Sequence, residues 1–483
     1  MKNKLFLLVC LMAFVLVAVT PALAQDKTQI KMWIAFTDNR LDWAKDKAAR
    51  FGELFPQYEV IVEGYPNYEQ LFSATALAAG NDALPSIVQY FEVATQNARD
   101  SGYFKSIADA LGDRTEINGV AVALDDIIDP TTAYYTLDGK FTSMPWNTSS
   151  SIMFSNMNIL KAAGVDTPPA TWAEMEAVCE KVMALSSAPE YCFTWPNHGW
   201  FFEQWLAQQN QEYANNGNGR DARATATNIG SDAAVALLTW LKDMSNKGYL
   251  YYSGARDGAS WGTVDQAFQS QQVAMAIYSS SDTALYTETG KQNGYEVVAS
   301  FLPYNQDAEG GWTGNLIGGA SLWLVDGLAP EVEEGALTWL LWFNNTENAA
   351  EWHQVTGYLP IRKSAVELLN TNGWYAAIEA MGPSAVWTNN TLVQDSKDEV
   401  WFEANPNFRV ASDQLAGSQI TPATRGAILG NFPAIRSIVT TAIDTILLTP
   451  DADIPGILAT AQDNANASLT QYNTLVQRAL GQQ

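Results

Sequence analysis

The chain alternates short apolar runs with longer stretches in which apolar residues recur every three or four positions. Runs typical of strands lie at residues 30–36, 59–65 and 86–91. Between them, residues 41–55 and 68–79 have helical periodicity. This β-α-β-α-β order predicts a parallel sheet with helices on its faces.

The alternation continues through the rest of the chain. Thr171 and Glu174 have the spacing of a capping box at a helix start. Residues 210–228 are polar and rich in Asn, Gly and Ala, which predicts an exposed loop. Further strands are predicted at 151–154, 273–278, 296–302 and 320–325, and further helices at 171–185, 233–244 and 332–343. We therefore expect an α/β protein, and the chain length predicts about two to three domains.

The N-terminus has the pattern of a secretion signal. Lys2 and Lys4 precede an apolar run at residues 5–19, and Ala22-Leu23-Ala24 is a small-residue cleavage site. A bilayer-spanning helix needs about 20 apolar residues, so this run is short for an anchor. We expect a signal peptide over residues 1–24 and a periplasmic or extracellular protein, with an uncleaved anchor as the alternative.

Composition excludes several classes of function. The 52 acidic residues outnumber 27 basic ones, for a net charge of −25, which argues against nucleic acid and anionic membranes as partners. His198 and His353 are the only histidines, and no metal-ligand spacing, nucleophile elbow or phosphate loop is present. We expect no catalytic residue, metal or cofactor, and a secreted hydrolase is only a remote alternative.

Two cysteines follow the predicted signal peptide, Cys179 and Cys192. Export to an oxidising compartment permits a disulfide between them. Spacing alone leaves open whether they form that bridge or are two buried free thiols.

Seven segments carry a family resemblance. They read NYEQ at 67–70, QYFEVAT at 89–95, MPWNTSSSIMFSN at 144–156, VAMAIYSSS at 273–281, IGGASLW at 317–323, NAAEWHQVTGYLPI at 348–361 and GNFPAIRSIV at 430–439. They resemble the extracellular solute-binding proteins, family 1, of carbohydrate-type ABC importers, and within that family its glycerol-3-phosphate-binding branch.

The resemblance implies the type II periplasmic binding-protein fold, with two α/β lobes, a hinge and a ligand cleft between the lobes. The chain would cross between lobes near residues 145, 280 and 345. The implied N-terminal lobe comprises residues 25–145 and 281–345, and the C-terminal lobe comprises 146–280 and 346–483.

The resemblance also implies a set of ligand-binding residues. Arg436 offers a rigid fork of donors suited to phosphate, and Glu92 can accept hydrogen bonds from glycerol hydroxyls. Tyr358 could instead be a packed core residue, and Arg436 could pair with a neighbouring acid. The full set is Tyr68, Glu92, Ser149, Trp200, Ser279, Gly319, Tyr358 and Arg436.

Two positions depart from the family pattern. Asn197 stands where the family has the first tryptophan of a Trp-x-x-Trp pair that ends here at Trp200, and Ile428 stands where it has an arginine. Losing one aromatic wall could enlarge the pocket, which would suit a glycerophosphodiester or a sugar phosphate.

The expected function is therefore that of the substrate-binding component of an ABC importer, capturing sn-glycerol 3-phosphate or a related glycerophosphodiester. The chain's 17 tryptophans keep an oligosaccharide as the alternative ligand, because aromatic faces stack on sugars. The expected partners are the transmembrane subunits of a permease, and we expect the protein itself to be a monomer.

Overall fold

The structure is a computed structural model that describes residues 26–480. The predicted signal peptide, residues 1–24, lies outside these described residues. Among the described helices, none combines the length and the apolar character needed to cross a membrane.

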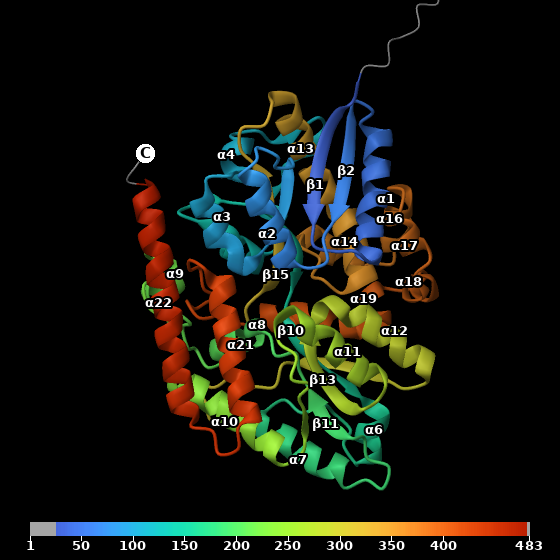
Figure 1. The fold of residues 1–483 in the computed structure, drawn as a ribbon. Coiled ribbons are helices and arrows are strands. Elements are labelled where there is room, and N and C mark those ends of the chain that lie inside the picture. Colours follow the sequence, from blue (N-terminus) through green and yellow to red (C-terminus); the bar gives the residue numbers. More distant parts are fainter. Residues whose placement is uncertain (1–25, 481–483) are drawn as a thin grey trace, which may run out of the picture.

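The first sheet forms the upper half of the molecule in Figure 1 and runs in the order β2-β1-β3-β15-β4, with β9 also paired to β15. β1 is parallel to β2 and β3, whereas β15 is antiparallel to β3 and β9. The predicted β-α-β-α-β unit is confirmed. The strands are β1 (Thr28–Ile34), β2 (Tyr58–Gly64), β3 (Ile87–Phe91), β4 (Phe104–Lys105), β9 (Met144–Ser149) and β15 (Gly318–Val325); the helices are α1 (Asn39–Leu54), α2 (Tyr68–Ala79), α3 (Thr95–Ser101) and α13 (Pro330–Phe343).

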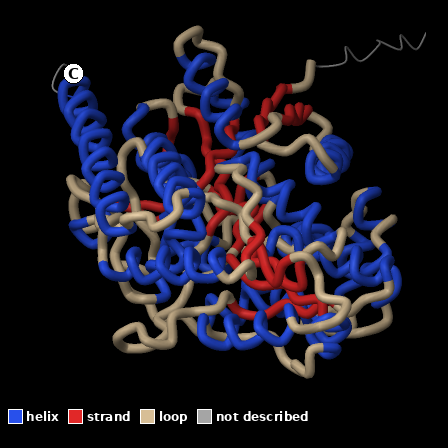
Figure 2. The backbone as a smooth tube through the Cα atoms, turned by 60° about the horizontal axis from the view of Figure 1, so that its bottom comes forward, coloured by secondary structure: helices blue, strands red, loops and turns tan. Residues whose placement is uncertain are grey.

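The second sheet forms the lower half and runs in the order β12-β11-β13-β10-β14. Helices surround both sheets, so the strands lie inside the molecule (Figure 2). The strands are β10 (Ser151–Asn156), β11 (Tyr191–Thr194), β12 (Leu250–Tyr251), β13 (Val273–Ser279) and β14 (Val297–Phe301); the helices include α7 (Trp172–Met183), α8 (Gly199–Gln208), α10 (Asp232–Asn246), α11 (Ser260–Gln269) and α12 (Thr283–Asn293).

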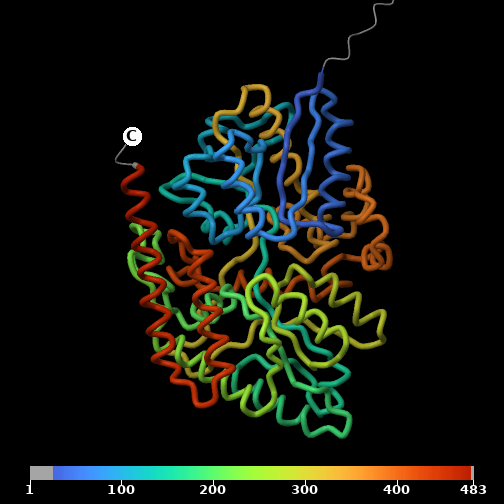
Figure 3. The backbone as a smooth tube through the Cα atoms, in the orientation of Figure 1, coloured from blue at the N-terminus to red at the C-terminus, as the bar shows by residue number. Residues whose placement is uncertain are grey.

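The chain first passes between the halves at Ser150, between β9 and β10 (Figure 3). This is close to the crossing expected near Pro145. The expected crossing near Ser280 is wrong, because β14 pairs with β10 and the chain returns to the first sheet only between Phe301 and Gly318. Within 281–345, β14 thus belongs to the second sheet; the remaining lobe boundaries stay predictions.

The C-terminal part of the chain is helical. The two longest helices of this part, α21 and α22, pack against each other and against α10 of the lower half. The helices are α14 (Thr346–Thr356), α15 (Lys363–Leu369), α16 (Trp374–Ala380), α17 (Ala385–Thr388), α18 (Thr391–Ser396), α19 (Trp401–Ala404), α20 (Val410–Ala416), α21 (Phe432–Leu448) and α22 (Ile454–Leu480).

Residues 210–228 were predicted as a loop, and their one short helical turn is left-handed, with positive φ at Asn216, Gly217 and Asn218. The predicted cap of α7 is confirmed, since the Thr171 side chain accepts from the backbone N–H of Glu174.

A buried polar network holds α14 in place. The Glu351 carboxylate accepts from the indole N–H of Trp43 at 2.9 Å and from the ammonium of Lys47. It also accepts from the backbone N–H of Ser384 at 3.0 Å. These bonds join α1, α14 and the start of α17. Because unpaired buried charges are costly, the network fixes the position of α14 relative to the first sheet.

Cys179 on α7 and Cys192 on β11 form a disulfide, with their Cα atoms 5.3 Å apart. Both residues are buried. The bridge therefore joins a helix to the sheet strand that it covers.

We predict that the double variant Cys179→Ala/Cys192→Ala unfolds with a free energy about 3 kcal/mol lower than the wild type, because the bridge closes a short loop in the unfolded chain. Urea unfolding measures this difference. A reducing agent should lower the wild-type stability similarly and leave the double variant unchanged. Wild-type unfolding that ignores the reductant would contradict the prediction.

Candidate ligand-binding cleft

A cavity of about 290 Å³ lies where residues from both sheets meet. It is lined by all eight residues that the sequence predicted as ligand-binding, which come from segments far apart in the chain. These are Tyr68, Glu92, Ser149, Trp200, Ser279, Gly319, Tyr358 and Arg436. The structure thus brings the whole predicted set together around one space.

Two of these residues stand at the carboxyl ends of parallel strands. Tyr68 begins α2 after β2, and Glu92 follows β3 directly. The ring of Tyr68 stacks on Phe91 with centroids 5.3 Å apart, and its hydroxyl accepts from the Asn147 amide at 2.7 Å. Burial, together with nearby Tyr358 and Glu92, raises the pKa of Tyr68 well above its usual value. This hydroxyl therefore stays protonated and can donate to a ligand.

Three of the lining residues come from strands at the junction of the halves. Ser149 ends β9 and Ser279 ends β13. Gly319 on β15 has φ of +96°, and a Cβ there would lie 1.8 Å from the backbone oxygen of Asn147. Only glycine fits at this position, and it lets the backbone approach the cavity closely.

Tyr358 is held by the helix that precedes it. Its backbone oxygen lies 2.7 Å from Nδ1 of His353, and its ring stacks on Trp352 with centroids 5.6 Å apart. Burial lowers the pKa of His353 to about 4, so this imidazole is neutral and acts as a positioning group. Burial also raises the pKa of Tyr358, which keeps its hydroxyl protonated.

Arg436 on α21 is bound by two carboxylates. Glu203 on α8 accepts from its Nε at 2.6 Å and its Nη2 at 2.9 Å, which is a two-pronged pairing. Glu92 accepts from Nη2 at 2.5 Å. All three side chains are buried. The alternative that Arg436 pairs with an acid is therefore observed. Of its two partners, Glu92 lines the cavity, whereas Glu203 is not among the lining residues.

The ion cluster Glu92–Arg436–Glu203 holds two carboxylates for one guanidinium. Desolvation disfavours the charge on Arg436. The attraction of Glu203 and Glu92, with their hydrogen bonds, outweighs this desolvation and raises the pKa of the guanidinium. Desolvation raises the pKa of Glu203, against the attraction of Arg436. His198, which lines the same cavity, has its pKa lowered by burial and by Arg436 and is neutral.

Several lining residues were not predicted from the sequence. Arg40, Asp265 and Asp282 form a second charged group in the cavity. The Asp265 carboxylate accepts from the hydroxyls of Tyr278 at 2.9 Å and Tyr286 at 2.8 Å. Desolvation and repulsion from Asp282 raise the pKa of Asp265 to about 7. None of these residues belongs to a local motif, so the sequence offered no signal for them.

The aromatic wall of the cavity consists of Trp200 and Trp261, whose ring centroids lie 6.4 Å apart. Trp261 comes from α11, a helix that the sequence did not predict. Asn197, the departure from the family pattern, is buried and donates to the Tyr252 hydroxyl and the Thr440 backbone oxygen, each at 3.0 Å. It does not line the cavity, and neither does Ile428.

A second space, which we call the outer chamber, has a volume of about 400 Å³ and adjoins the first cavity. The two spaces share several lining residues, Arg436 among them. The residues that line only the outer chamber are Gln70, Arg256, Asp257, Ala259, Pro433 and Ser437.

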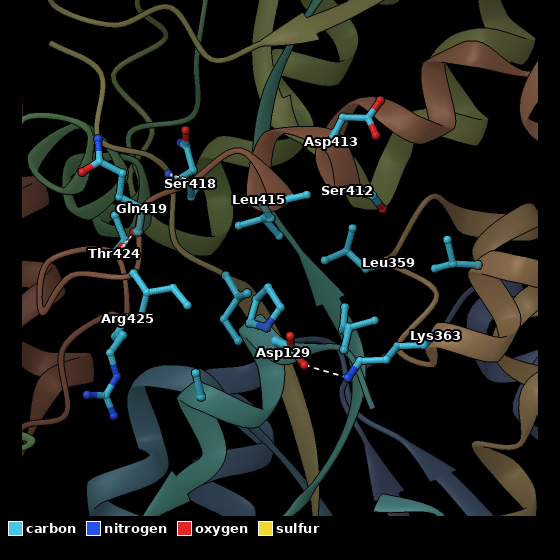
Figure 4. Close-up of a pocket in the computed structure, with 18 of the residues that line it drawn as sticks. Asp129, Leu359, Lys363, Ser412, Asp413, Leu415, Ser418, Gln419, Thr424 and Arg425 are labelled. Carbon is cyan, nitrogen blue, oxygen red and sulfur yellow. Dashed lines mark hydrogen bonds and ion pairs between the residues drawn. The ribbon is translucent and has the colours of Figure 1, made fainter. Parts of the chain in front are cut away.

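A third cavity, of about 550 Å³, has Asp129, Leu359 and Arg425 among its lining residues (Figure 4). Its wall is mainly apolar, with Leu359 and Leu415 among its residues, and an ion pair of 2.8 Å joins Asp129 and Lys363 at its edge. It is larger than the cavity at Arg436, but it contains none of the eight predicted residues. Polar groups that converge on one point identify a ligand site better than volume does.

We predict that Asp265→Asn raises the melting temperature more at pH 8 than at pH 5. With its pKa raised from 3.8 to about 7, folded Asp265 keeps a proton that the unfolded chain releases, so wild-type stability falls as pH rises through that window. Thermal melts at both pH values measure the difference. Asp243→Asn, exposed on α10, is the control, and equal shifts of Asp265→Asn at both pH values would refute the prediction.

Comparisons with known proteins agree with this geometry. The chain is 29% identical over 450 residues to the sn-glycerol-3-phosphate-binding periplasmic protein UgpB of Salmonella typhimurium, covering 92% of this chain and 93% of that protein. It is also 29% identical over 426 residues to UgpB of Yersinia pestis, covering 87% of each.

Solved structures show the same fold. UgpB from Mycobacterium tuberculosis, in complex with glycerophosphocholine, superposes with a TM-score of 0.71 at 20% identity, over 92% of this chain and 99% of that one. The cyclic α-maltosyl-1,6-maltose binding protein from Arthrobacter globiformis superposes with a TM-score of 0.66 at 17% identity, over 92% and 100%. These neighbours confirm the expected two-lobed α/β binding-protein fold.

A family model described as bacterial extracellular solute-binding protein matches residues 47–383. The expectation of a binding protein, not an enzyme, is confirmed, and the chain is the solute-binding component of an ABC importer. The chain belongs to the family of bacterial extracellular solute-binding proteins.

Proposed function

We propose that this protein captures a glycerol phosphate ester, either sn-glycerol 3-phosphate or a glycerophosphodiester, in the cavity at Arg436. The observation that carries the proposal is the convergence of a buried guanidinium, a carboxylate and protonated hydroxyls on one small cavity. Arg436 supplies the cation for a phosphate, and Glu92 supplies the acceptor for glycerol hydroxyls.

The hydrogen-bonding capacity of the cavity supports this assignment. Within the part of the chain that the structure describes, Nε and Nη2 of Arg436 are occupied by carboxylates, and Nη1 donates to no protein group. Nη1 is therefore the donor available to a phosphate oxygen. Tyr68 and Tyr358 keep their protons and can donate to the remaining oxygens.

We further propose that Tyr68 and Glu92 act from the N-terminal lobe, and Trp200 and Arg436 from the C-terminal lobe. A ligand that touches both sets would hold the lobes together by hinge closure. The closed protein, a secreted monomer in the periplasm or outside the cell, would then deliver its ligand to the transmembrane subunits of the permease.

An oligosaccharide is the second candidate ligand. The observation in its favour is the aromatic wall of Trp200 and Trp261, since aromatic faces stack on sugar rings. The Arthrobacter neighbour has a maltose-type ligand by its description. The cavity of about 290 Å³ adjoins the outer chamber of about 400 Å³, so volume does not separate the two ligand classes. The buried guanidinium of Arg436 favours the anionic glycerol esters.

We predict that calorimetry detects binding of glycerophosphocholine or glycerol 3-phosphate to the wild type and no binding of maltose. Arg436→Ala should abolish binding of the phosphate ester, because the phosphate loses its cation. Since this variant leaves two buried carboxylates unpaired and can misfold, Tyr358→Phe is the second test and should weaken binding about three- to tenfold through one lost hydrogen bond.

Tyr304→Phe, at a half-buried position shortly after β14, serves as the matched hydroxyl control; Tyr304 does not line the cavity. Maltose binding without phosphate-ester binding would favour the oligosaccharide alternative. Unchanged affinity for the phosphate ester in a folded Arg436→Ala protein would refute the proposed site.

A further inference from the structure

Residues 215–228, which we call the strap, are anchored in the lower half of the molecule. The backbone N–H of Thr227 donates to the Asn466 side chain on α22 at 2.7 Å. The Asn473 side chain, also on α22, donates to the Ala224 backbone oxygen at 2.9 Å. Because α22 packs on α21 and α10, these bonds attach the strap to the helices of the lower half.

Two arginines of the strap contact the upper half. Arg223 donates from its two Nη atoms to the Asp100 carboxylate on α3, at 2.8 and 2.7 Å, in a two-pronged pairing. Arg220 lies over the ring of Tyr134, 4.9 Å from its centroid, and donates to the Tyr134 backbone oxygen at 3.3 Å. Tyr134 belongs to α5 (Asp129–Tyr135), which packs on β9, whereas α3 packs on β3 and β4. Both arginines therefore join the strap to helices of the first sheet.

Asp100 receives a further bond from α22, which extends from the lower half to the level of α3 (Figure 1). The Tyr472 hydroxyl of α22 donates to Asp100 at 2.9 Å. A Cβ at Gly430 would lie 2.0 Å from the ring of Tyr472, so this ring packs directly on the backbone just before α21. The Asp100 side chain is only 9% exposed. A carboxylate of the upper half is thus enclosed by donors of the lower half.

This cluster is separate from the ligand cleft. Asp100, Arg223 and Tyr472 line neither the inner cavity nor the outer chamber. Asp100 nevertheless lies on the helix that follows Glu92, and Tyr472 packs beside the start of the helix that carries Arg436. The cluster therefore joins the same two elements as the ligand-lining pair Glu92–Arg436, at a second point.

We propose that the cluster Asp100–Arg223–Tyr472 is an interlobe latch that stabilises the closed arrangement of the halves, which is the arrangement in this structure. Opening of the cleft would separate α3 from the strap and α22, and Asp100 would exchange the donors of Arg223 and Tyr472 for water. The latch acts from outside the cleft, so it does not depend on which ligand the cleft takes.

The size of the effect follows from the type of bond. Two-pronged, charge-assisted bonds to a shielded carboxylate stabilise more than exposed ion pairs do. Their loss should lower the closed-to-open ratio about tenfold. The apparent affinity of a ligand that binds the closed form scales with the closed fraction, so it should fall about two- to tenfold.

The first test measures the closed fraction without any ligand, from the distance between spin labels on the two halves by pulsed electron paramagnetic resonance. Cys179 and Cys192 are paired, so the labels can be attached at Lys45→Cys on α1 and Ala177→Cys on α7, which are exposed positions. The labelled protein with the latch intact should populate the closed distance.

The latch variants are then compared in this labelled protein. Arg223→Ala should lower the closed-to-open ratio about tenfold, and Tyr472→Phe, which removes one hydroxyl and keeps the ring, about threefold. Arg114→Ala is the matched control, because it removes an arginine–carboxylate pair of 2.7 Å, with Glu334, that lies within the upper half. Absence of the closed distance with the latch intact, or an Arg223→Ala effect no larger than that of Arg114→Ala, would overturn the inference.

The second test measures the affinity for glycerophosphocholine by calorimetry. Arg223→Ala should weaken binding about two- to tenfold although it does not line the cleft, and Arg114→Ala should leave binding unchanged. Equal affinities of Arg223→Ala and Arg114→Ala would contradict the control of affinity by the latch. If the wild type does not bind the ester, the proposed function fails, and the label distances still decide on the latch.

Discussion

The buried ion cluster Glu92–Arg436–Glu203 is the interaction on which the cleft depends. It joins the end of β3 in the first sheet to α8 and α21, which pack against each other and against α10. Removing one member of a buried charge cluster leaves the charges of the others uncompensated in the interior. The three side chains therefore depend on one another. The same cluster sets the orientation of the guanidinium and the net charge that a ligand meets. Architecture and ligand selection therefore depend on the same three residues.

The rest of the fold positions groups around this cluster. The crossing strands bring Ser149 and Gly319 to the junction of the sheets, where only a glycine avoids the backbone of Asn147. Helix α14 is fixed by the Glu351 network at one side and presents Tyr358 just past its end, where His353 holds the backbone. Regular strands and helices therefore hold these side chains in place on their own elements.

Local patterns in the sequence predicted the layers of the fold. Alternation of strand and helix periods located the first β-α-β-α-β unit, and Thr171 marked the start of α7. Pairing between strands that are distant in the sequence leaves no local pattern. For this reason the sequence predicted the wrong lobe for β14, which pairs with β10 of the second sheet. The eight ligand-lining residues came from family resemblance. Glu203 was missed because its partner, Arg436, lies 233 positions away in the sequence. Asp265 was missed because its partner Tyr278 lies 13 positions away, on another element.

The central claim about this cleft is that the phosphate of the ligand is bound at Arg436 while Glu203 keeps its pairing. A crystal structure with bound glycerophosphocholine tests it most directly. We expect a phosphate oxygen within hydrogen-bond distance of Nη1 of Arg436, the glycerol hydroxyls at Glu92, and the two Glu203 bonds intact. A ligand seated away from Arg436 would contradict this claim.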